Sequence, residues 1–569
     1  MIKTRNSKLE IRKKVNNLID CIKSNWITGL IVISAFFLYM LVIYPSGSFQ
    51  CIDSKCGIHF WGAHEHDGVW HIAIIESAFQ SYPFIFPTFY GQFLSGYNFL
   101  LDIVILLIVK FGISSWDVYF RLLPTIWFIV FVLVLKKFSE VRKNSVGYFP
   151  ILLFVILFSS SLGFIIQLKN NHNIWGSSGI PTMQGALSMT NPQYLWSLIF
   201  VLLLWNMLRE NKRNYLSGFY AFILLGLKFY AVLPAIVMIG IAGMRDMMQK
   251  KWSSLIHLII SSFLGGVLAY MVFYSSNKSS GLVFSPMSLP KQIVEDPNMW
   301  HMASIIQTWY TLSQAGNIFS PRLWIISFII ILLFVVFNFG IRLLGVLADI
   351  VKLLKGKLTF DNAVIITVFF ASILVPVLFI QKGDWWNTIQ FLYYGIFVSS
   401  ISLANNIHSI FIKKKIVFWS LLLVLILLFL PAQVDLIRSF ALGGSTYISR
   451  DELDSLTKLK SYKNGIVLVQ PFFGNSTSIL ADTIDTSYVS ALSGKQTFMA
   501  DEIQMRLLGI DYKGRMDTLK ENPCTFLSQV DYVYIRKNHT HNLLGKCIRE
   551  ESSFVMSYSN DTTEVWRKK

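Results

Sequence analysis

The sequence predicts a polytopic α-helical membrane protein with about 10–12 membrane helices and a small α/β domain at its C-terminal end. Its 569 residues are 54% hydrophobic and only 14% charged, and the mean hydropathy is +0.53. Apolar runs long enough to cross a bilayer recur along most of the chain, whereas residues 433–569 are polar and mixed. A composition this apolar excludes a soluble enzyme.

An apolar run from about Trp26 to Tyr44 follows the basic residues 1–25. This run is long enough to cross a hydrocarbon core of about 30 Å and is longer than the core of a signal peptide. We therefore expect a retained first helix. Its basic flank places the N-terminal side in the cytoplasm, so that the chain is an integral protein of the plasma (inner) membrane.

Hydropathy predicts further spans along the chain. They lie at about Val118–Leu135, Phe149–Leu168, Tyr194–Leu208, Leu255–Tyr274, Leu323–Leu343, Ala363–Ile380, Thr388–Ala404 and Ile416–Leu430. Short basic clusters such as Lys136–Lys143 alternate with these spans, and the positive-inside rule places the clusters in the cytoplasm. This explains the net charge of +18 without nucleic acid, for which no basic domain with interleaved aromatic residues is present.

Two apolar segments do not fit the alternation as single spans. Tyr97–Lys110 is short, and we expect a re-entrant or interfacial helix with Asp102 on one face. Tyr215–Gly243 is expected to form a helix pair whose turn carries Lys228 at or near the outer surface. A lysine in the membrane costs roughly 2.5–3.5 kcal/mol on insertion scales, which favours a functional role with a phosphate as its partner. Snorkelling to the interface is the alternative.

The resulting domain organisation has three parts. Residues 1–25 form a cytoplasmic N-terminus, residues 26–432 form the membrane domain with residues 46–117 as its first external loop, and residues 433–569 form an external α/β domain. The external side then holds four cysteines in two plausible pairs, and an oxidising compartment favours both disulfides. The expected pairs are Cys51 with Cys56 and Cys524 with Cys547.

The first external loop contains an unusual concentration of ionisable residues between His64 and His71. Such a cluster could bind a divalent cation, hold a phosphate through that cation, or act as a general base. The metal alternative would use Mg or Mn on Glu65, Asp67, His64 and His66, since no zinc signature is present. The acids could also simply cap the following helix. That helix is expected to lie along the membrane surface, with Trp70, Ile74 and Ala78 on its apolar side.

Polar residues in the external loops are further candidates for substrate contact. These candidates are His66, His71, Asn191, Gln193, His301 and Asp384. The Asn191-Pro192 pair has an alternative role as an ordinary helix start, with asparagine as the cap and proline in the first turn.

The order of these features resembles the GT-C superfamily of integral-membrane glycosyltransferases. That superfamily includes protein O-mannosyltransferases, lipid A aminoarabinose transferases and the catalytic subunits of oligosaccharyltransferases. The resemblance rests on the acidic motif Glu65–Asp67 after one span, the segment Phe120–Lys137, the pair Asn191-Pro192, the segment Gly226–Lys228 and the external C-terminal domain.

The resemblance implies transfer of a sugar from a polyprenyl-phosphate-linked donor on the outer face of the membrane. Asp67 would be the catalytic base with Glu65 beside it, and Lys228 and Arg322 would contact the donor phosphate. The partners would be membrane lipid and a glycan, lipid or protein acceptor. The second loop is neutral near Asn191, where some members carry an acid, so metal dependence stays open. A flippase of lipid-linked glycans is the main alternative, although no inverted repeat is evident, and a non-catalytic cell-envelope assembly protein is the third.

Overall fold

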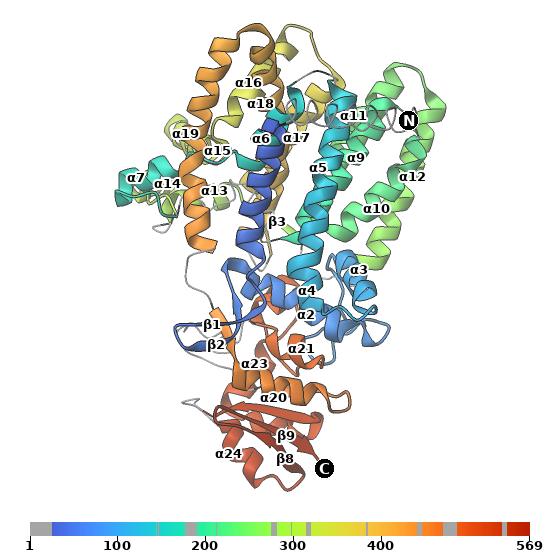
Figure 1. The fold of residues 1–569 in the computed structure, drawn as a ribbon, viewed down its shortest axis with the longest axis vertical. Helices are drawn as coiled ribbons and strands as arrows, with labels where there is room; N and C mark the ends of the chain where they lie inside the picture. Colours follow the sequence, from blue (N-terminus) through green and yellow to red (C-terminus); the bar gives the residue numbers. More distant parts are fainter. Residues whose placement is uncertain are drawn as a thin grey trace, which may run out of the picture.

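The computed structural model describes residues 26–143, 145, 147–176, 191–211, 213–274, 281–296, 299–314, 320–382, 385–440, 446–469, 486–537 and 543–569. The molecule is elongated. Its long helices are bundled at one end, the C-terminal sheet lies at the other, and the β1–β2 hairpin with α2 and α4 lies between them (Figure 1).

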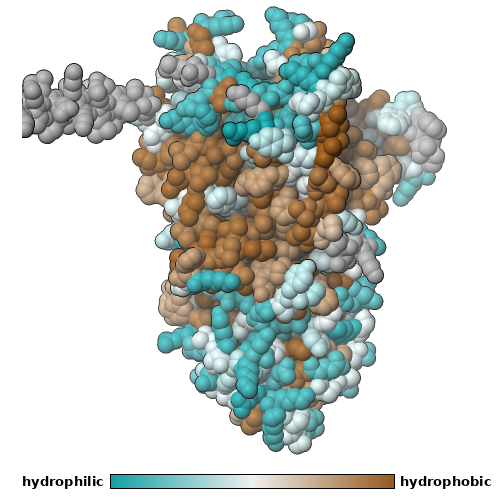
Figure 2. All heavy atoms as spheres, turned by 90° about the vertical axis from the view of Figure 1, so that its right-hand side faces the viewer, coloured by the Kyte–Doolittle hydropathy of each residue, from teal (hydrophilic) through white to brown (hydrophobic). Residues whose placement is uncertain are grey.

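Within the described ranges, nine helices are long and apolar enough to cross a membrane. They are Trp26–Ile43, Ser115–Arg142, Tyr148–Asn171, Phe229–Met248, Trp252–Tyr274, Pro321–Phe339, Phe360–Leu378, Trp385–Lys413 and Lys415–Ser439. Figure 2 shows their lipid-facing side as an apolar band between hydrophilic ends. The prediction of an integral, polytopic helical membrane protein is confirmed.

The bundle contains most of the helices of the chain. Their bounds are α5 (Leu123–Arg142), α6 (Tyr148–Phe158), α7 (Gly163–Asn171), α9 (Pro192–Glu210), α10 (Ser217–Leu227), α11 (Val232–Met248), α12 (Trp252–Ala269), α13 (Ser288–Glu295), α14 (Ala303–Gln314), α15 (Pro321–Phe339), α16 (Arg342–Leu354), α17 (Phe360–Leu378), α18 (Gln390–Lys413) and α19 (Lys415–Phe440). The short strands β3 (Leu282–Phe284) and β4 (Phe379–Gln381) pair beside it.

One predicted span is broken. The run Phe149–Leu168 divides after α6, and the side chain of Arg342 fills the break. Its guanidinium donates to the carbonyl oxygens of Ser159 and Ser160 and to the hydroxyl of Ser400. Because the last carbonyls of a helix have no partner inside the helix, a buried arginine at this position satisfies them within the apolar bundle.

The two segments that did not fit the alternation form a short helix and a helix pair, as predicted, while their positions relative to the membrane surface stay predictions. The first is α3 (Leu100–Val109), a ten-residue helix packed on α2 and α10. The second is the pair α10 and α11, which is interrupted at Lys228 in an extended conformation. The last predicted span ends later than expected, since α19 continues to Phe440, so that a domain boundary at residue 433 falls inside this helix.

The remaining elements form the region below the bundle in Figure 1. They are β1 (Ser48–Ile52), β2 (Lys55–Phe60), α2 (Asp67–Ser77), α4 (Ser115–Asp117), β5 (Thr446–Ser449), α20 (Arg450–Lys460), β6 (Val467–Val469), α21 (Tyr488–Ser493), α22 (Glu502–Leu507), α23 (Lys513–Glu521), β7 (Tyr532–Arg536), α24 (Leu543–Glu550), β8 (Phe554–Ser559) and β9 (Thr563–Lys568). The main sheet has the order β6-β7-β9-β8, with β6 parallel to β7 and the other pairs antiparallel.

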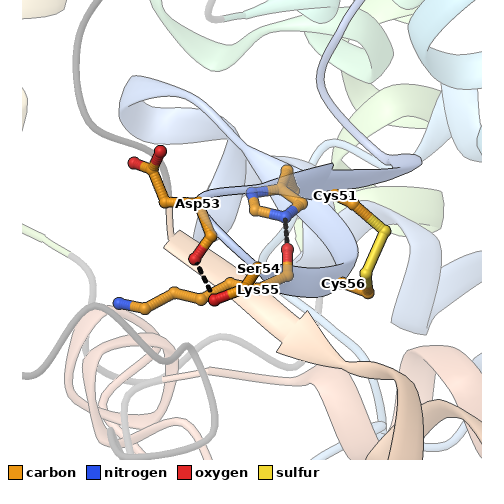
Figure 3. Close-up of a disulfide and its surroundings, with 6 residues drawn as sticks. Cys51, Asp53, Ser54, Lys55 and Cys56 are labelled. Atoms are coloured by element: carbon orange, nitrogen blue, oxygen red, sulfur yellow. Dashed lines mark hydrogen bonds between the residues drawn. A yellow bond between two sulfur atoms is a disulfide. The ribbon is translucent and has the colours of Figure 1, made fainter.

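The first loop and the C-terminal segment share one core. Strand β5 joins β1 and β2 in a three-stranded sheet. Val69 of α2 lies in the same apolar cluster as Ile448 and Tyr534. Both predicted disulfides are confirmed, and Figure 3 shows Cys51 and Cys56 bonded across the β1–β2 turn.

The predicted position of α2 on the membrane surface is wrong. Nine of its eleven residues are buried, and Trp70, Ile72 and Ile74 are all 0% exposed. The apolar residues occupy several sides of the helix rather than one stripe, and α3 and α21 both pack on it. The helix is therefore an internal element of the region below the bundle, covered by the C-terminal segment.

Candidate active site

A cavity of about 170 Å³ lies where the bundle meets the C-terminal segment. The predicted residues Asp67, His71, Asn191 and Lys228 all line it. The rest of the lining is Gly96, Tyr97, Asn98, Phe229, Tyr230, Tyr274, Leu282, Gln381, Asn387, Gln390, Gln504, Leu507 and Leu508. Residues from the first loop, six parts of the membrane domain and the region of α22 therefore meet around one space.

Asp67 begins α2 and points its carboxylate toward the cavity, with its side chain 44% exposed. His66 lies between two carboxylates: its Nδ1 is 3.3 Å from Oδ1 of Asp67 and its Nε2 is 3.2 Å from Oδ1 of Asp501. Asp501 is fully buried and also accepts hydrogen bonds from the Ser487 hydroxyl and the Gln504 backbone N–H. The C-terminal segment thus holds the histidine next to the predicted base.

The charges of His66, Asp67 and Asp501 stabilise one another. Burial favours a neutral His66, but the charge and hydrogen bond of Asp501, together with those of Asp67, outweigh it and hold the pKa of His66 well above its usual value. Burial would also raise the pKa of Asp67. The hydrogen bond and charge of His66, with the charges of Lys228 and His71, instead lower that pKa. An imidazolium between two carboxylates keeps Asp67 ionised and able to accept a proton.

Lys228 occupies the break between α10 and α11. The side chain of Asn98 donates to the Leu227 carbonyl at 3.0 Å and closes the end of α10. The lysine is only 7% exposed, and its Nζ lies 5.6 Å from the Tyr230 ring centroid. Among the residues that the structure describes, Nζ has no hydrogen-bond or ion-pair partner. A buried cation that faces a cavity in this way is suited to binding an anion.

His71 belongs to a second buried network at the same cavity. Its Nδ1 lies 2.9 and 3.0 Å from the two carboxylate oxygens of Asp102, and 3.0 Å from the side-chain amide of Gln193. Its Nε2 lies 3.1 Å from the Tyr97 hydroxyl. Asp102 is 0% exposed, and its position on α3 inside an apolar helix is explained by this histidine.

Asn191 caps the start of α9, which was its alternative role. Its Oδ1 accepts from the Tyr194 backbone N–H at 3.0 Å, and Pro192 occupies the first turn of α9. The same residue lines the cavity. Capping and cavity lining are compatible here because the helix begins at the cavity wall.

Several predicted residues lie elsewhere. Glu65 turns away and accepts a hydrogen bond from Thr446. His64 is buried against Ser46, with its Nδ1 2.7 Å from the hydroxyl. His301 and Arg322 are exposed and do not line the cavity. Asp384 lies outside the described residues.

The predicted metal set is not assembled. Within the described ranges, no group of three or more His, Cys, Asp or Glu side chains is placed to hold a metal ion. Glu65 and His64 point to other partners. The residues present therefore do not fit the Mg or Mn site expected from the sequence.

Four cavity or network residues were missed as site residues: Tyr97, Asp102, Asp501 and Gln504. A carboxylate within the apolar run 97–110 was the one available signal, because a buried acid needs a partner. Nothing in the sequence relates Asp501 to His66, since 435 positions separate them.

No protein-family profile matches the chain, and no curated protein matches it. Solved structures do match the chain in fold. The oligosaccharyltransferase of Archaeoglobus fulgidus in its apo form matches with a TM-score of 0.52 at 12% identity, over 90% of this chain and 70% of that one. The chain has the GT-C fold. The resemblance seen in the sequence is confirmed at the level of architecture, which identity this low can show.

Two further structures of that archaeal enzyme share the GT-C fold with this chain. One is the AglB complex with an inhibitory peptide and a dolichol-phosphate, with a TM-score of 0.50 at 12% identity over 90% of this chain and 70% of that one. The other is a complex with Zn and sulfate, with a TM-score of 0.50 at 12% identity over 89% and 68%.

Proposed function

We propose that this protein is a membrane glycosyltransferase that moves a sugar from a polyprenyl-phosphate carrier to an acceptor, with Asp67 as the base. The observation that carries the proposal is that an ionised carboxylate and a buried lysine, which has no ion-pair partner among the described residues, line one cavity at the end of an apolar bundle. The GT-C fold, which an oligosaccharyltransferase solved with a dolichol-phosphate shares, supports it.

The chemistry follows from the two charges. Asp67 accepts the proton of an acceptor hydroxyl or amine while that atom forms a bond to the anomeric carbon of the sugar. The bond between the anomeric carbon and the phosphate oxygen breaks, and the carrier phosphate leaves with the electron pair. The positive charge of Lys228 stabilises this leaving group. His66 and Asp501 keep the base ionised before the acceptor binds.

The cavity wall favours a lipid-borne donor. Leu282 of β3 lines the cavity, and its neighbours Val283 and Phe284 are 45% and 65% exposed. A strand that carries exposed apolar side chains from the cavity to the surface of the bundle gives a hydrocarbon chain a dry path. The phosphate can then lie in the cavity while the chain stays in the membrane.

The proposed location of the reaction is the outer face of the plasma (inner) membrane, with the N-terminus in the cytoplasm. The disulfides Cys51–Cys56 and Cys524–Cys547 support it, because both belong to the region around the cavity and disulfides persist in oxidising compartments. The donor sugar and the class of acceptor are left to the assay.

The test uses the full-length protein in proteoliposomes with undecaprenyl phosphate that carries one radiolabelled sugar at a time. Asp67→Asn is expected to lower turnover about 10²- to 10⁴-fold, the usual contribution of a positioned base. Lys228→Met is expected to raise the donor KM. Asp53→Asn, in the exposed β1–β2 turn, is the control and should leave both quantities unchanged.

Unchanged turnover in Asp67→Asn would show that Asp67 is not the catalytic base. Movement of an intact lipid-linked glycan across the bilayer, without sugar transfer by the wild type, would establish the flippase alternative instead.

A further inference from the structure

The cavity presents a second polar group beside Lys228, the hydroxyl of Tyr97. The backbone around this tyrosine is fixed on both sides. The Gly96 N–H donates to the Phe273 carbonyl at 2.8 Å, and the Asn98 side chain donates to the Leu227 carbonyl at 3.0 Å. The second bond joins the residue after Tyr97 to the residue before Lys228, so the two side chains enter the cavity from adjoining segments.

His71 determines which way the tyrosine hydroxyl points. Because the Asp102 carboxylate only accepts hydrogen bonds, Nδ1 of His71 carries a proton toward it, and Nε2 faces Tyr97. This assignment turns the Gln193 amide so that its otherwise unpartnered Oε1, rather than its NH₂ group, faces Nδ1. If Nε2 is unprotonated, the Tyr97 O–H donates to it and only the phenol oxygen faces the cavity. If Nε2 is protonated, it donates to the phenol oxygen and the Tyr97 O–H is released to donate into the cavity.

We propose that the Tyr97 hydroxyl is the second donor to the carrier phosphate, so that a phosphate oxygen lies between it and Nζ of Lys228. His71, held by Asp102, is the positioning residue that sets the direction of the tyrosine O–H. Arg322, the second phosphate contact expected from the sequence, is exposed and does not line the cavity. The identity of the phosphate as a sugar carrier rests on the proposed function, whereas the anion site itself does not.

The coupling between anion binding and the proton on His71 depends on the groups that surround this histidine. Asp102 of α3 is the counter-ion, Gln193 of α9 contacts Nδ1, the Tyr119 ring stacks at 5.9 Å, and Asp67 lies in the same cavity. Burial, and then the charges of Asp67 and Asp102, hold the pKa of Tyr97 well above its usual value, so the phenol keeps its proton. A bound anion that accepts from the Tyr97 O–H therefore needs a proton on Nε2 of His71, and binding takes that proton from solvent wherever the free protein lacks it.

The experiment measures binding rather than turnover. The probe is methyl octyl phosphate, a phosphodiester with one constant charge, titrated calorimetrically into the purified full-length protein in detergent. Measurements at about pH 5.5 and about pH 8.5 bracket the ordinary histidine range. Two buffers that differ in ionisation enthalpy give the number of protons taken up.

The wild type should bind more tightly at the lower pH and take up a proton on binding. Tyr97→Phe should bind about tenfold more weakly at the lower pH and lose the proton uptake, because a hydrogen bond to a charged partner is removed. Asp102→Asn should also lose the uptake, because the imidazolium loses its counter-ion. Tyr82→Phe, at an 87% exposed tyrosine, is the control and should match the wild type. Equal melting temperatures of Tyr97→Phe and the wild type establish that the phenylalanine variant is folded.

Unchanged affinity in Tyr97→Phe would overturn the proposal. Weaker binding in that variant with the proton uptake intact would also overturn it, because the proton would then not depend on the contact between His71 and Tyr97. Dimethyl phosphate is the second probe, and binding as tight as that of the octyl ester would overturn a lipid source for the phosphate. Tight, proton-coupled binding by a wild type that transfers no sugar would leave the phosphate site standing while the glycosyltransferase assignment fails.

Discussion

Replacing Asp501 with asparagine removes one of the two carboxylates that flank His66. The two groups are 3.2 Å apart, Asp501 is fully buried, and the His66 side chain is 21% exposed. Asparagine keeps an acceptor oxygen for the Gln504 N–H, so the start of α22 retains its cap. The substitution therefore changes the charge next to the imidazolium with little change in shape.

A hydrogen bond to a charged partner contributes about 1.5–3 kcal/mol. Replacing this charged acceptor by a neutral amide oxygen therefore lowers the pKa of His66 in the folded protein and removes about 1–2 kcal/mol of stability where His66 is protonated. In the wild type this pKa is raised, so the stabilisation from His66 is fully present below its unfolded pKa of about 6.5 and is lost as the pH rises through the folded pKa. The variant should be destabilised most below about pH 6.5, and the pH-dependent part of the difference should vanish at high pH.

The assay is thermal unfolding of the full chain in detergent from about pH 5 to about pH 9, a range that brackets the usual histidine pKa. Asp517→Asn, at an exposed carboxylate on α23, is the matched control and should give a Tm difference near zero at every pH. A Tm difference for Asp501→Asn that stays constant across the whole range would refute the linkage between Asp501 and His66.

Two further predictions concern stability. Gly265→Ala should lower the Tm, at a cost of about 1–3 kcal/mol, because a Cβ there would lie 2.0 Å from the Gly218 carbonyl where α12 crosses α10; Gly266→Ala, with open space around it, should not. Thermal scans of the two variants side by side decide this, and equal melting temperatures would contradict the close approach. Cys524→Ser should destabilise the C-terminal region by about 3 kcal/mol and Cys51→Ser by about 2 kcal/mol, since the disulfides close loops of 23 and 5 residues. Denaturant unfolding with and without reductant measures both, and a larger loss from the shorter loop would contradict the loop-entropy account.

The sequence predicted best those features that depend on local pattern. Apolar run length predicted eight of the nine membrane-spanning helices of the described ranges, whereas the run Tyr194–Leu208 forms α9, which is not among the nine. A single lysine inside an apolar run marked the break between α10 and α11. Topology brought Cys524 and Cys547 to the same side, and the disulfide followed. These predictions succeeded because the bilayer imposes length and charge rules that act on each segment independently.

The features that the sequence did not reveal depend on long-range packing. The period of apolar residues in α2 is the same whether lipid or protein covers them, so the helix was assigned to the membrane surface although α21 and α3 bury it. The partner of His66 lies in α22's N-terminal cap, which looks like an ordinary helix start in the sequence. Charge alone selected His301 and Arg322, but both side chains are exposed and neither lines the cavity.

The shared core of the first loop and the C-terminal segment also sets an order of assembly. Strand β2 pairs with β5. The Thr446 hydroxyl donates a hydrogen bond to Glu65, although Thr446 is synthesised 381 residues after Glu65. The cavity lacks the α22 wall, and His66 lacks Asp501, until the final part of the chain has been made and has folded against the first loop. A chain that ends before α22 thus carries all nine membrane-spanning helices of the described ranges and still has an unfinished cavity, so that the proposed site is complete only when the polypeptide is.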